Sequence, residues 1–295
     1  MERPRLEEED FPGLYHASDE LSNSTQRKYL LLVKGFLVLL VAAAVISIFS
    51  FEIVALKLVS ALVYLLVLVL TVATYLTNLN KRWYNARAIA ESVKTMTWRF
   101  VMCADPYPSS LRDPELTQAF VDDLKLMFNQ NRDIARYLSG THIGKENVTQ
   151  AMRRIRRLSF KVRLGLYIKE RIDNQLDWYK RRTVFNTTRS GRWFGALVGL
   201  LSIAVAAILV GLVLSSTISL ISQVANTAVA CSLTWIQIKR YAELSAAFNL
   251  TANEIGFIKS LSGKVQSDSD LNRYVRDAEN AFSREHTQLV ARRDQ

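Results

Sequence analysis

Residues that form disulfides or bind metal ions are scarce in this chain. Its 295 residues include only two cysteines and three histidines. Cys103 lies in a charged segment and Cys231 in an uncharged one, so we expect neither a disulfide nor a thiolate metal site. The histidines, His16, His142 and His286, are far apart in the sequence. These absences exclude a disulfide-stabilised scaffold and give no reason to expect a metal or another cofactor.

Charged residues are absent from three long runs, at 35–51, 58–80 and 193–238. Hydrophobic residues make up 49% of the chain and the mean hydropathy is +0.07, which excludes a purely soluble or disordered protein. A helix needs about 20 apolar residues to cross a bilayer, so the third run has room for two helices. We therefore expect an all-α membrane protein with two transmembrane helical hairpins, that is four spans, and a bundle of long helices outside the bilayer.

Basic residues are concentrated between the two hairpins. Residues 79–192 carry 23 basic and 11 acidic side chains, a net charge of +12, whereas the whole chain has a net charge of +11. Lysine and arginine also flank both apolar blocks, and these residues favour the cytoplasmic side of a membrane. We therefore expect both termini and the helical bundle in the cytoplasm. The predicted parts are a cytoplasmic N-terminal segment (1–27), a first transmembrane hairpin (28–79), a cytoplasmic helical region (80–191), a second transmembrane hairpin (192–238) and cytoplasmic C-terminal helices (239–295).

The segments outside the hairpins show the periodicity of amphipathic helices, and none alternates for long enough to predict a strand. We expect a helix that runs straight on from the membrane over 80–102 and ends before Asp105-Pro106. A second helix is expected to begin at Asp113, with Pro114 at its first position. Further helices are predicted over 147–158, 159–189, 239–261 and 267–293. The two halves form an approximate architectural repeat, because a Lys-Arg-aromatic step follows each hairpin.

Polar residues form a stripe on the fourth predicted span. Its members are Ser219, Gln223, Asn226 and Thr234, with Ser222, Thr227 and Gln237 at its margins. Steps of 4, 3 and 8 residues place the four members on one face of a helix. One interpretation is a pore-lining face in an oligomer. The other is hydrogen bonding between helices that only holds the spans together.

Three glycines recur at four-residue steps where the third span begins. They are Gly191, Gly195 and Gly199. Such a series lets another helix approach closely, so we interpret these residues as a helix-packing face. The partner is either the adjacent fourth span, which we favour because a tight turn joins the two helices, or a neighbouring subunit.

The densest basic cluster of the chain lies in the central segment. It consists of Arg153, Arg154, Arg156, Arg157 and Lys161, with Arg163 beyond. Such a cluster could bind a phosphate-rich ligand such as a cyclic nucleotide, or anionic lipid headgroups. We favour an ordinary solvated helix face. No aromatic residue interleaves the arginines and no glycine-rich phosphate loop is present, so we do not expect nucleic acid as a partner.

No catalytic arrangement is apparent, and we expect that the chain is not an enzyme. The stretch around Glu285 and His286 lacks the spacing of a zinc site, since no second histidine is near. Glu279 on the same helix is better explained by hydrogen bonding between helices. We likewise expect interhelical ion pairs for two groups of charged residues. These are Glu91 with Lys94, and Arg171 with Asp173, Gln175 and Asp177.

Four stretches of this sequence resemble one bacterial family. They are 82–100 (RWYNARAIAESVKTMTWRF), 167–179 (YIKERIDNQLDWY), 232–241 (SLTWIQIKRY) and 277–287 (DAENAFSREHT). The chain is similar to the tandem, four-span form of the SLATT superfamily (SMODS and SLOG associating two-transmembrane effector domains), also known as the DUF4231 domain. These stretches have no catalytic geometry, so they are specific for the family and not for a reaction.

The resemblance implies a membrane effector of a bacterial conflict or antiphage defence system. Such an effector is expected to form a homo-oligomer and to permeabilise the bacterial inner membrane, as a pore or channel. The signal would come from a partner sensor protein or a nucleotide second messenger, such as a cyclic nucleotide. The alternative function is a non-conducting membrane scaffold whose cytoplasmic helical bundle recruits partners.

Overall fold

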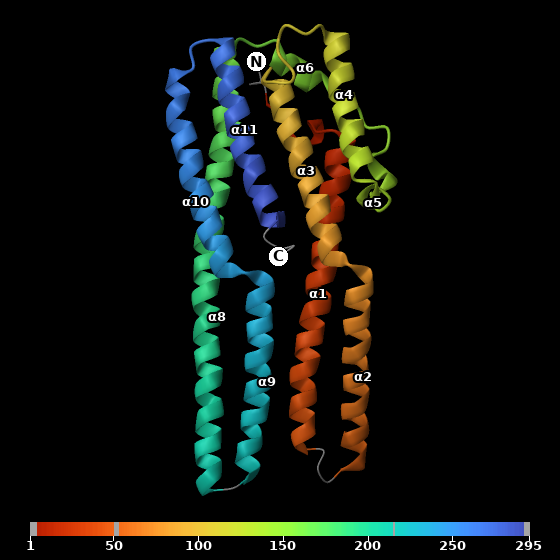
Figure 1. Cartoon of the computed structure of the whole chain (residues 1–295), viewed down its shortest axis with the longest axis vertical. Coiled ribbons are helices and arrows are strands. Elements are labelled where there is room, and N and C mark those ends of the chain that lie inside the picture. The colour runs from red at the N-terminus through yellow and green to blue at the C-terminus, as the bar shows by residue number, and fades with distance from the viewer. Residues whose placement is uncertain (1–4, 50–52, 215, 292–295) are drawn as a thin grey trace. The chain divides into compact units, whose positions relative to one another are not determined.

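The computed structural model describes residues 5–49, 53–214 and 216–291, and it is helical with no strand among them (Figure 1). The chain divides into two compact units. One, which we call the hairpin unit, comprises residues 27–79 and 181–248; the other, the bundle unit, comprises residues 1–26, 80–180 and 249–295. The prediction of an all-α chain is confirmed.

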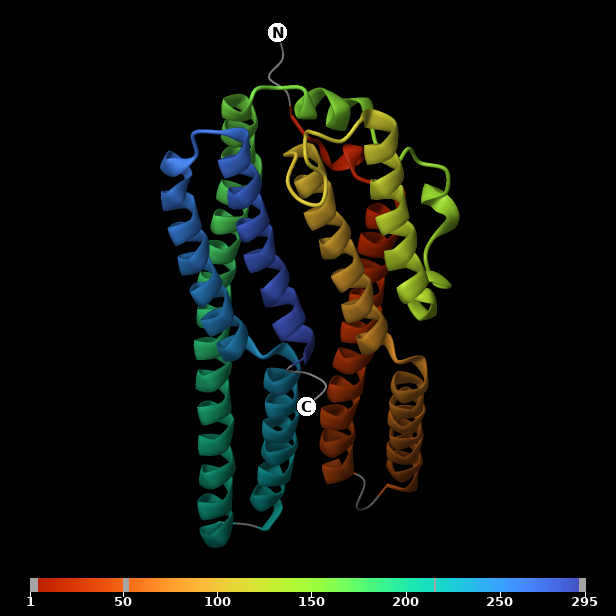
Figure 2. The same cartoon turned by 45° about the horizontal axis from the view of Figure 1, so that its top comes forward.

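The hairpin unit contains the charge-free runs of the sequence. Its first hairpin joins the C-terminal part of α1 (Gly13–Phe49) to α2 (Val54–Thr77), and its second joins α8 (Asn174–Val213) to α9 (Ser216–Lys239). In both views the two helices of each hairpin run side by side (Figures 1 and 2). Among the described residues, three helical stretches are long and apolar enough to cross a membrane, at Gly13–Phe49, Val54–Val101 and Phe160–Val213. α9 is not among them, because polar residues dilute its apolar character.

The two hairpins pack on each other through α1 and α9. A buried cluster is formed by Val33 and Leu37 of α1 with Cys231 and Trp235 of α9, and Tyr241 completes it. The Cys231 thiol donates to the Leu37 carbonyl oxygen at 3.7 Å. One face of α9 is therefore occupied by α1, which decides where its polar residues lie.

Each hairpin ends at a residue in the left-handed conformation. Asn78, with φ 46°, separates α2 from α3 (Leu79–Val101), and Arg240, with φ 48°, separates α9 from α10 (Tyr241–Ser260). The prediction that these helices run straight on from the membrane is wrong, because a left-handed residue interrupts the α-helical path. α8 instead continues without a break from the bundle unit into the hairpin unit.

The bundle unit is built from long helices and short connecting turns. It contains α3, the N-terminal part of α1 and the C-terminal part of α10. Its other helices are α4 (Asp113–Gln130), α5 (Arg132–Ala135), α6 (Gln150–Arg156), α7 (Phe160–Tyr167) and α11 (Asp268–Ala291), with short 3-10 turns at Glu8–Asp10, Gly140–His142 and Leu261–Lys264. The predicted start of α4, with proline in its first turn, is confirmed. A π-helical segment, Ile168–Asp173, joins α7 to α8. Such segments place one extra residue in a helical turn and so change which side chains face inward.

Candidate functional site

The polar stripe lies on the side of α9 that no other part of the hairpin unit covers. Gln223 and Asn226 are exposed, whereas Ala225 and the Cys231 and Trp235 side chains that pack on α1 are buried. Five exposed positions recur at helical steps on the side away from these buried residues. They are Gln223, Asn226, Ala230, Leu233 and Gln237, which we call the open face of α9; Ile221 is exposed on another side of the helix.

Two residues of the predicted stripe, Gln223 and Asn226, belong to the open face. The other two, Ser219 and Thr234, do not belong to it. Thr234 is half-buried and its hydroxyl donates to the Ala230 carbonyl of its own helix at 2.9 Å. Gln237, which the sequence placed at the margin, lies on the open face in its stead. The side chain of Ser219 lies outside the described residues.

The two central amides of the open face have no partner in the described part of the chain. Beside them, the Thr227 hydroxyl donates at 2.9 Å to the backbone carbonyl of Gln223. Transfer of a primary amide from water to hydrocarbon without a compensating hydrogen bond costs about 2 to 7 kcal/mol, depending on the reference state. Gln223 and Asn226 therefore favour an arrangement in which water or another chain covers this face.

The glycine series of α8 has no helix packed on it within the hairpin unit. A Cβ atom built at Gly191, Gly195 or Gly199 would meet no atom within 4 Å. The preference for the fourth span as the partner of these glycines is therefore wrong, because α9 does not approach this face. These three glycines therefore lie on an exposed face of α8.

The basic cluster divides into structural and exposed members. Arg153 pairs with Asp113, Arg156 donates to the carbonyl oxygens of Phe100 and Tyr107, and the buried Arg163 donates to the Met102 carbonyl at 2.6 Å. Arg156 and Arg163 thus satisfy backbone acceptors at and just after the end of α3, as lysine and arginine commonly do at helix ends. The exposed members are Arg154, Arg157 and Lys161. Within this cluster, these three exposed side chains are the ones that could contact a ligand or a lipid headgroup.

A fully buried carboxylate connects three helical segments of the bundle unit. Glu279 of α11 is 0% exposed and accepts from Tyr167 at 2.8 Å and from Thr95 at 2.9 Å. Arg171 of the π-helical segment adds two further bonds, from Nε at 2.9 Å and Nη2 at 2.8 Å. Burial raises the pKa of the Tyr167 hydroxyl well above its usual value, and the charge of Glu279 adds to this. The predicted interhelical roles of Glu279 and Arg171 are confirmed.

The other charged residues expected in interhelical pairs differ in outcome. Glu91 pairs with Arg87, four residues before it on its own helix, and Arg87 also reaches Asp19 of α1 at 3.0 Å. Asp173 meets Lys259 of α10 at 2.7 Å, as expected for a pair between helices. Lys94 forms no ion pair with a described residue, which the sequence did not indicate.

Two histidines that are far apart in the sequence meet in the bundle unit. The rings of His16 and His142 stack with centroids 5.3 Å apart, and the Lys145 ammonium lies 2.6 Å from His16 Nε2. Burial lowers the pKa of His16, and the charge of Lys145 lowers it further. No group of three His, Cys, Asp or Glu residues in the described part of the chain is arranged to hold a metal ion. The side chain of His286 lies outside the described residues.

Comparison with protein families matches nearly the whole chain. Residues 12–164 match SMODS and SLOG-associating 2TM effector domain 3, and residues 167–288 match SMODS and SLOG-associating 2TM effector domain 1. No curated protein and no solved structure matched in the corresponding searches. SLATT domains are membrane effectors associated with conflict and defence systems. The chain therefore belongs to the SLATT family and carries two of its membrane domains in tandem.

Proposed function

We propose that this chain is a pore-forming effector, in which several copies bring their α9 helices together around a path across the bilayer. In this arrangement the open face of α9 points toward water, and the apolar residues of the other spans face lipid. The exposed leucines and valines of α2, such as Leu62, Leu65 and Val69, suit contact with lipid.

The observation that carries the proposal is the exposure of Gln223 and Asn226 on an otherwise apolar hairpin. If these amides only joined the spans of one chain, they would be buried against α1, α2 or α8. They lie instead on the side of α9 away from the α1 contact at Cys231 and Trp235. In a membrane the unpaired amides favour either a second copy or a water-filled channel.

The test is leakage of a dye from liposomes that contain the purified full-length protein. We expect the double substitution Gln223→Leu, Asn226→Leu to reduce leakage at least tenfold, because a leucine-lined path excludes water and ions. The same substitutions should reduce the loss of membrane potential when the chain is overexpressed in bacterial cells.

A matched control keeps both amides and exchanges their lengths. Gln223→Asn with Asn226→Gln should leak like the wild type, because the polarity of the face is unchanged. Equal leakage from the double-leucine variant and the wild type would contradict a pore lined by α9. A wild type that oligomerises but neither leaks nor depolarises cells would favour the non-conducting scaffold.

The setting of this activity is part of the proposal. We place the protein in the bacterial inner membrane, with four spans and with both termini and the basic central segment in the cytoplasm, because lysine and arginine flank both hairpins there. Reporter fusions at each terminus would test this topology. A cytoplasmic bundle would be positioned to receive a signal from a sensor protein or a nucleotide second messenger.

A further inference from the structure

The bundle unit contains a pocket that the proposed pore does not use. Its volume is about 550 Å³, within the usual range for sites that bind small molecules. Residues 5–9 and Phe11 form one side, α3 contributes Lys94 and Trp98, and the π-helical segment contributes Glu170 and Arg171. The pocket therefore combines residues of the first SLATT domain with residues of the second.

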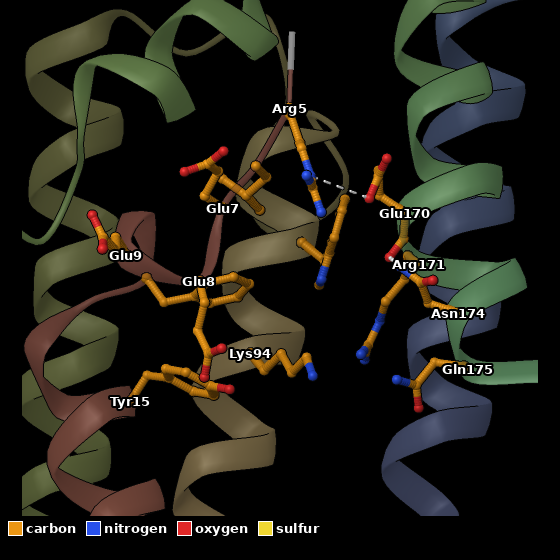
Figure 3. A pocket seen from close by; sticks show the side chains of 13 residues that line it. Arg5, Glu7, Glu8, Glu9, Tyr15, Lys94, Glu170, Arg171, Asn174 and Gln175 are labelled. Carbon is orange, nitrogen blue, oxygen red and sulfur yellow. Dashed lines mark hydrogen bonds and ion pairs between the residues drawn. The ribbon is translucent and has the colours of Figure 1, made fainter. Parts of the chain in front are cut away.

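Two cations extend into this pocket from opposite sides. Figure 3 shows the Lys94 side chain reaching from α3 and the Arg171 side chain reaching from the facing helix. Burial lowers the pKa of Lys94, and the positive charge of Arg171 lowers it further, while the carboxylates of Glu91 and Glu279 oppose this shift. Glu279 neutralises Arg171, but Lys94 has no ion pair with a described residue. An anion placed between the two would relieve their repulsion.

Two residues that line the pocket carry an unused hydrogen-bond donor, and one of them is Arg171 itself. Arg171 is 2% exposed and Trp98 is 3% exposed, yet Arg171 Nη1 and Trp98 Nε1 have no hydrogen-bond partner in the described part of the chain. Buried donors are almost always satisfied in folded proteins, and an unsatisfied one costs about 1 to 3 kcal/mol. Two orphan donors and an unpaired ammonium at one pocket are the features of an incomplete anion site.

The acidic residues at the pocket do not cancel this preference. Glu7, Glu8 and Glu9 are exposed to solvent, where water and salt screen their charges. Glu170 already faces Arg5 at 3.8 Å, the contact drawn in Figure 3. Lys94 and Arg171 are the less exposed charges at the pocket, whereas Arg5, Glu7, Glu8 and Glu9 are exposed, so a ligand with one anionic group beside Lys94 and Arg171 fits best.

We propose that this pocket binds a small phosphate-bearing ligand, with the phosphate between Lys94 and Arg171. A phosphate group carries a charge of about −1.5 to −2 and three oxygen atoms that point in different directions, so it can accept from an ammonium, a guanidinium and an indole N–H that approach from different sides. The phosphate can belong to a soluble phosphomonoester or to a lipid headgroup. Binding joins α3, which follows the first hairpin, to the helix that continues as α8 into the second.

The test measures ligand binding by calorimetry and by thermal unfolding of the full-length protein in detergent, so its result does not depend on pore activity. The probes are inorganic phosphate, ribose 5-phosphate and a short-chain phosphatidic acid, each compared with chloride at equal ionic strength. We expect Lys94→Gln to weaken binding about tenfold or more, because a charge-assisted hydrogen bond is lost. Without ligand, the same variant should unfold at a higher temperature, because an unpaired, partly buried cation is removed.

Two further variants make the result specific. Lys94→Arg should retain binding, and Lys125→Gln, which removes an exposed lysine outside the pocket, should bind like the wild type. Binding of phosphatidic acid alone, still dependent on Lys94, would assign the phosphate to a lipid headgroup. The proposal is overturned if none of the probes binds, or if Lys94→Gln binds them as tightly as the wild type.

Discussion

Glu279 shows how strongly a single residue can hold this protein together. Its buried carboxylate accepts from Thr95, Tyr167 and Arg171, and Glu279→Gln would leave the guanidinium of Arg171 buried without a counterion. Breaking one partner of a buried pair costs about 3 to 5 kcal/mol. We expect the free energy of unfolding of the full chain in detergent to fall by about this amount.

Two companion variants separate charge from packing at this residue. Asp122→Asn makes the same chemical change on the exposed face of α4, where Asp122 pairs with Lys125 at 3.1 Å, and it should unfold close to the wild type. Adding Arg171→Met to Glu279→Gln should recover part of the loss, because the guanidinium that lost its counterion is then removed as well. If Glu279→Gln alone unfolds like the wild type, the buried charge does not stabilise the bundle.

At the scale of elements, the left-handed residues at the ends of the hairpins decide the helix directions. Asn78 adopts φ 46° and is exposed, and asparagine tolerates this conformation better than other non-glycine residues. Asn78→Val should lower the free energy of unfolding by about 1 to 2 kcal/mol, since a β-branched residue is strained there. Asn78→Gly should match or exceed the wild type.

The neighbouring residue provides the control for this prediction. Thr77 lies in regular α-helix and its hydroxyl donates to the Ala73 carbonyl at 2.7 Å, so Thr77→Val should change the stability much less. Thermal unfolding of the three variants, monitored by helical circular dichroism, gives the comparison. An Asn78→Val variant as stable as Asn78→Gly would show that α2 and α3 can join into one straight helix.

These elements also show which parts of the structure could be predicted from sequence. The charge-free runs gave the positions of the hairpins, because a long apolar segment has few alternatives to a helix in a membrane. The breaks at Asn78 and Arg240 could not be predicted, since both residues also suit helix interiors or ends. The helical step places Gln223 and Asn226 on one face, but it could not show that Trp235 packs on α1 or that the adjacent Thr234 is half-buried.

The pocket and the buried carboxylate could not be predicted from the sequence, because residues that are far apart along the chain form them. Arg171 and Glu279 are 108 positions apart in the sequence. An interhelical role could be predicted for each residue, but their pairing with each other could not. Lys94 was expected in an ion pair, and only the three-dimensional arrangement shows that it faces another cation. The π-helical segment that carries Arg171 has no signal in the sequence, because its residues fit an ordinary helix equally well.

At the scale of the whole molecule, the exposed glycine face of α8 provides a separate test of assembly. Gly195→Leu should leave the stability of one chain nearly unchanged, because a Cβ at this position meets no atom within 4 Å. If a neighbouring copy packs closely on this face, the leucine should clash and convert the oligomer into single chains, as native mass spectrometry in detergent would measure. Ala196→Leu adds similar bulk at the next position, about 100° around the helix, and should leave the oligomer intact.

Comparison of the Gly195→Leu variant with the double-leucine variant of α9 decides whether assembly and conduction are separate properties. The glycines lie on α8 and the amides on α9, so close packing between copies and contact with water can occur on different helices of one hairpin. We therefore expect Gly195→Leu to abolish both oligomer and leakage, and the double-leucine variant of α9 to keep the oligomer while losing leakage. An intact, conducting oligomer with Gly195→Leu would exclude this face as the contact between copies, and would leave α9 as the helix through which the copies associate.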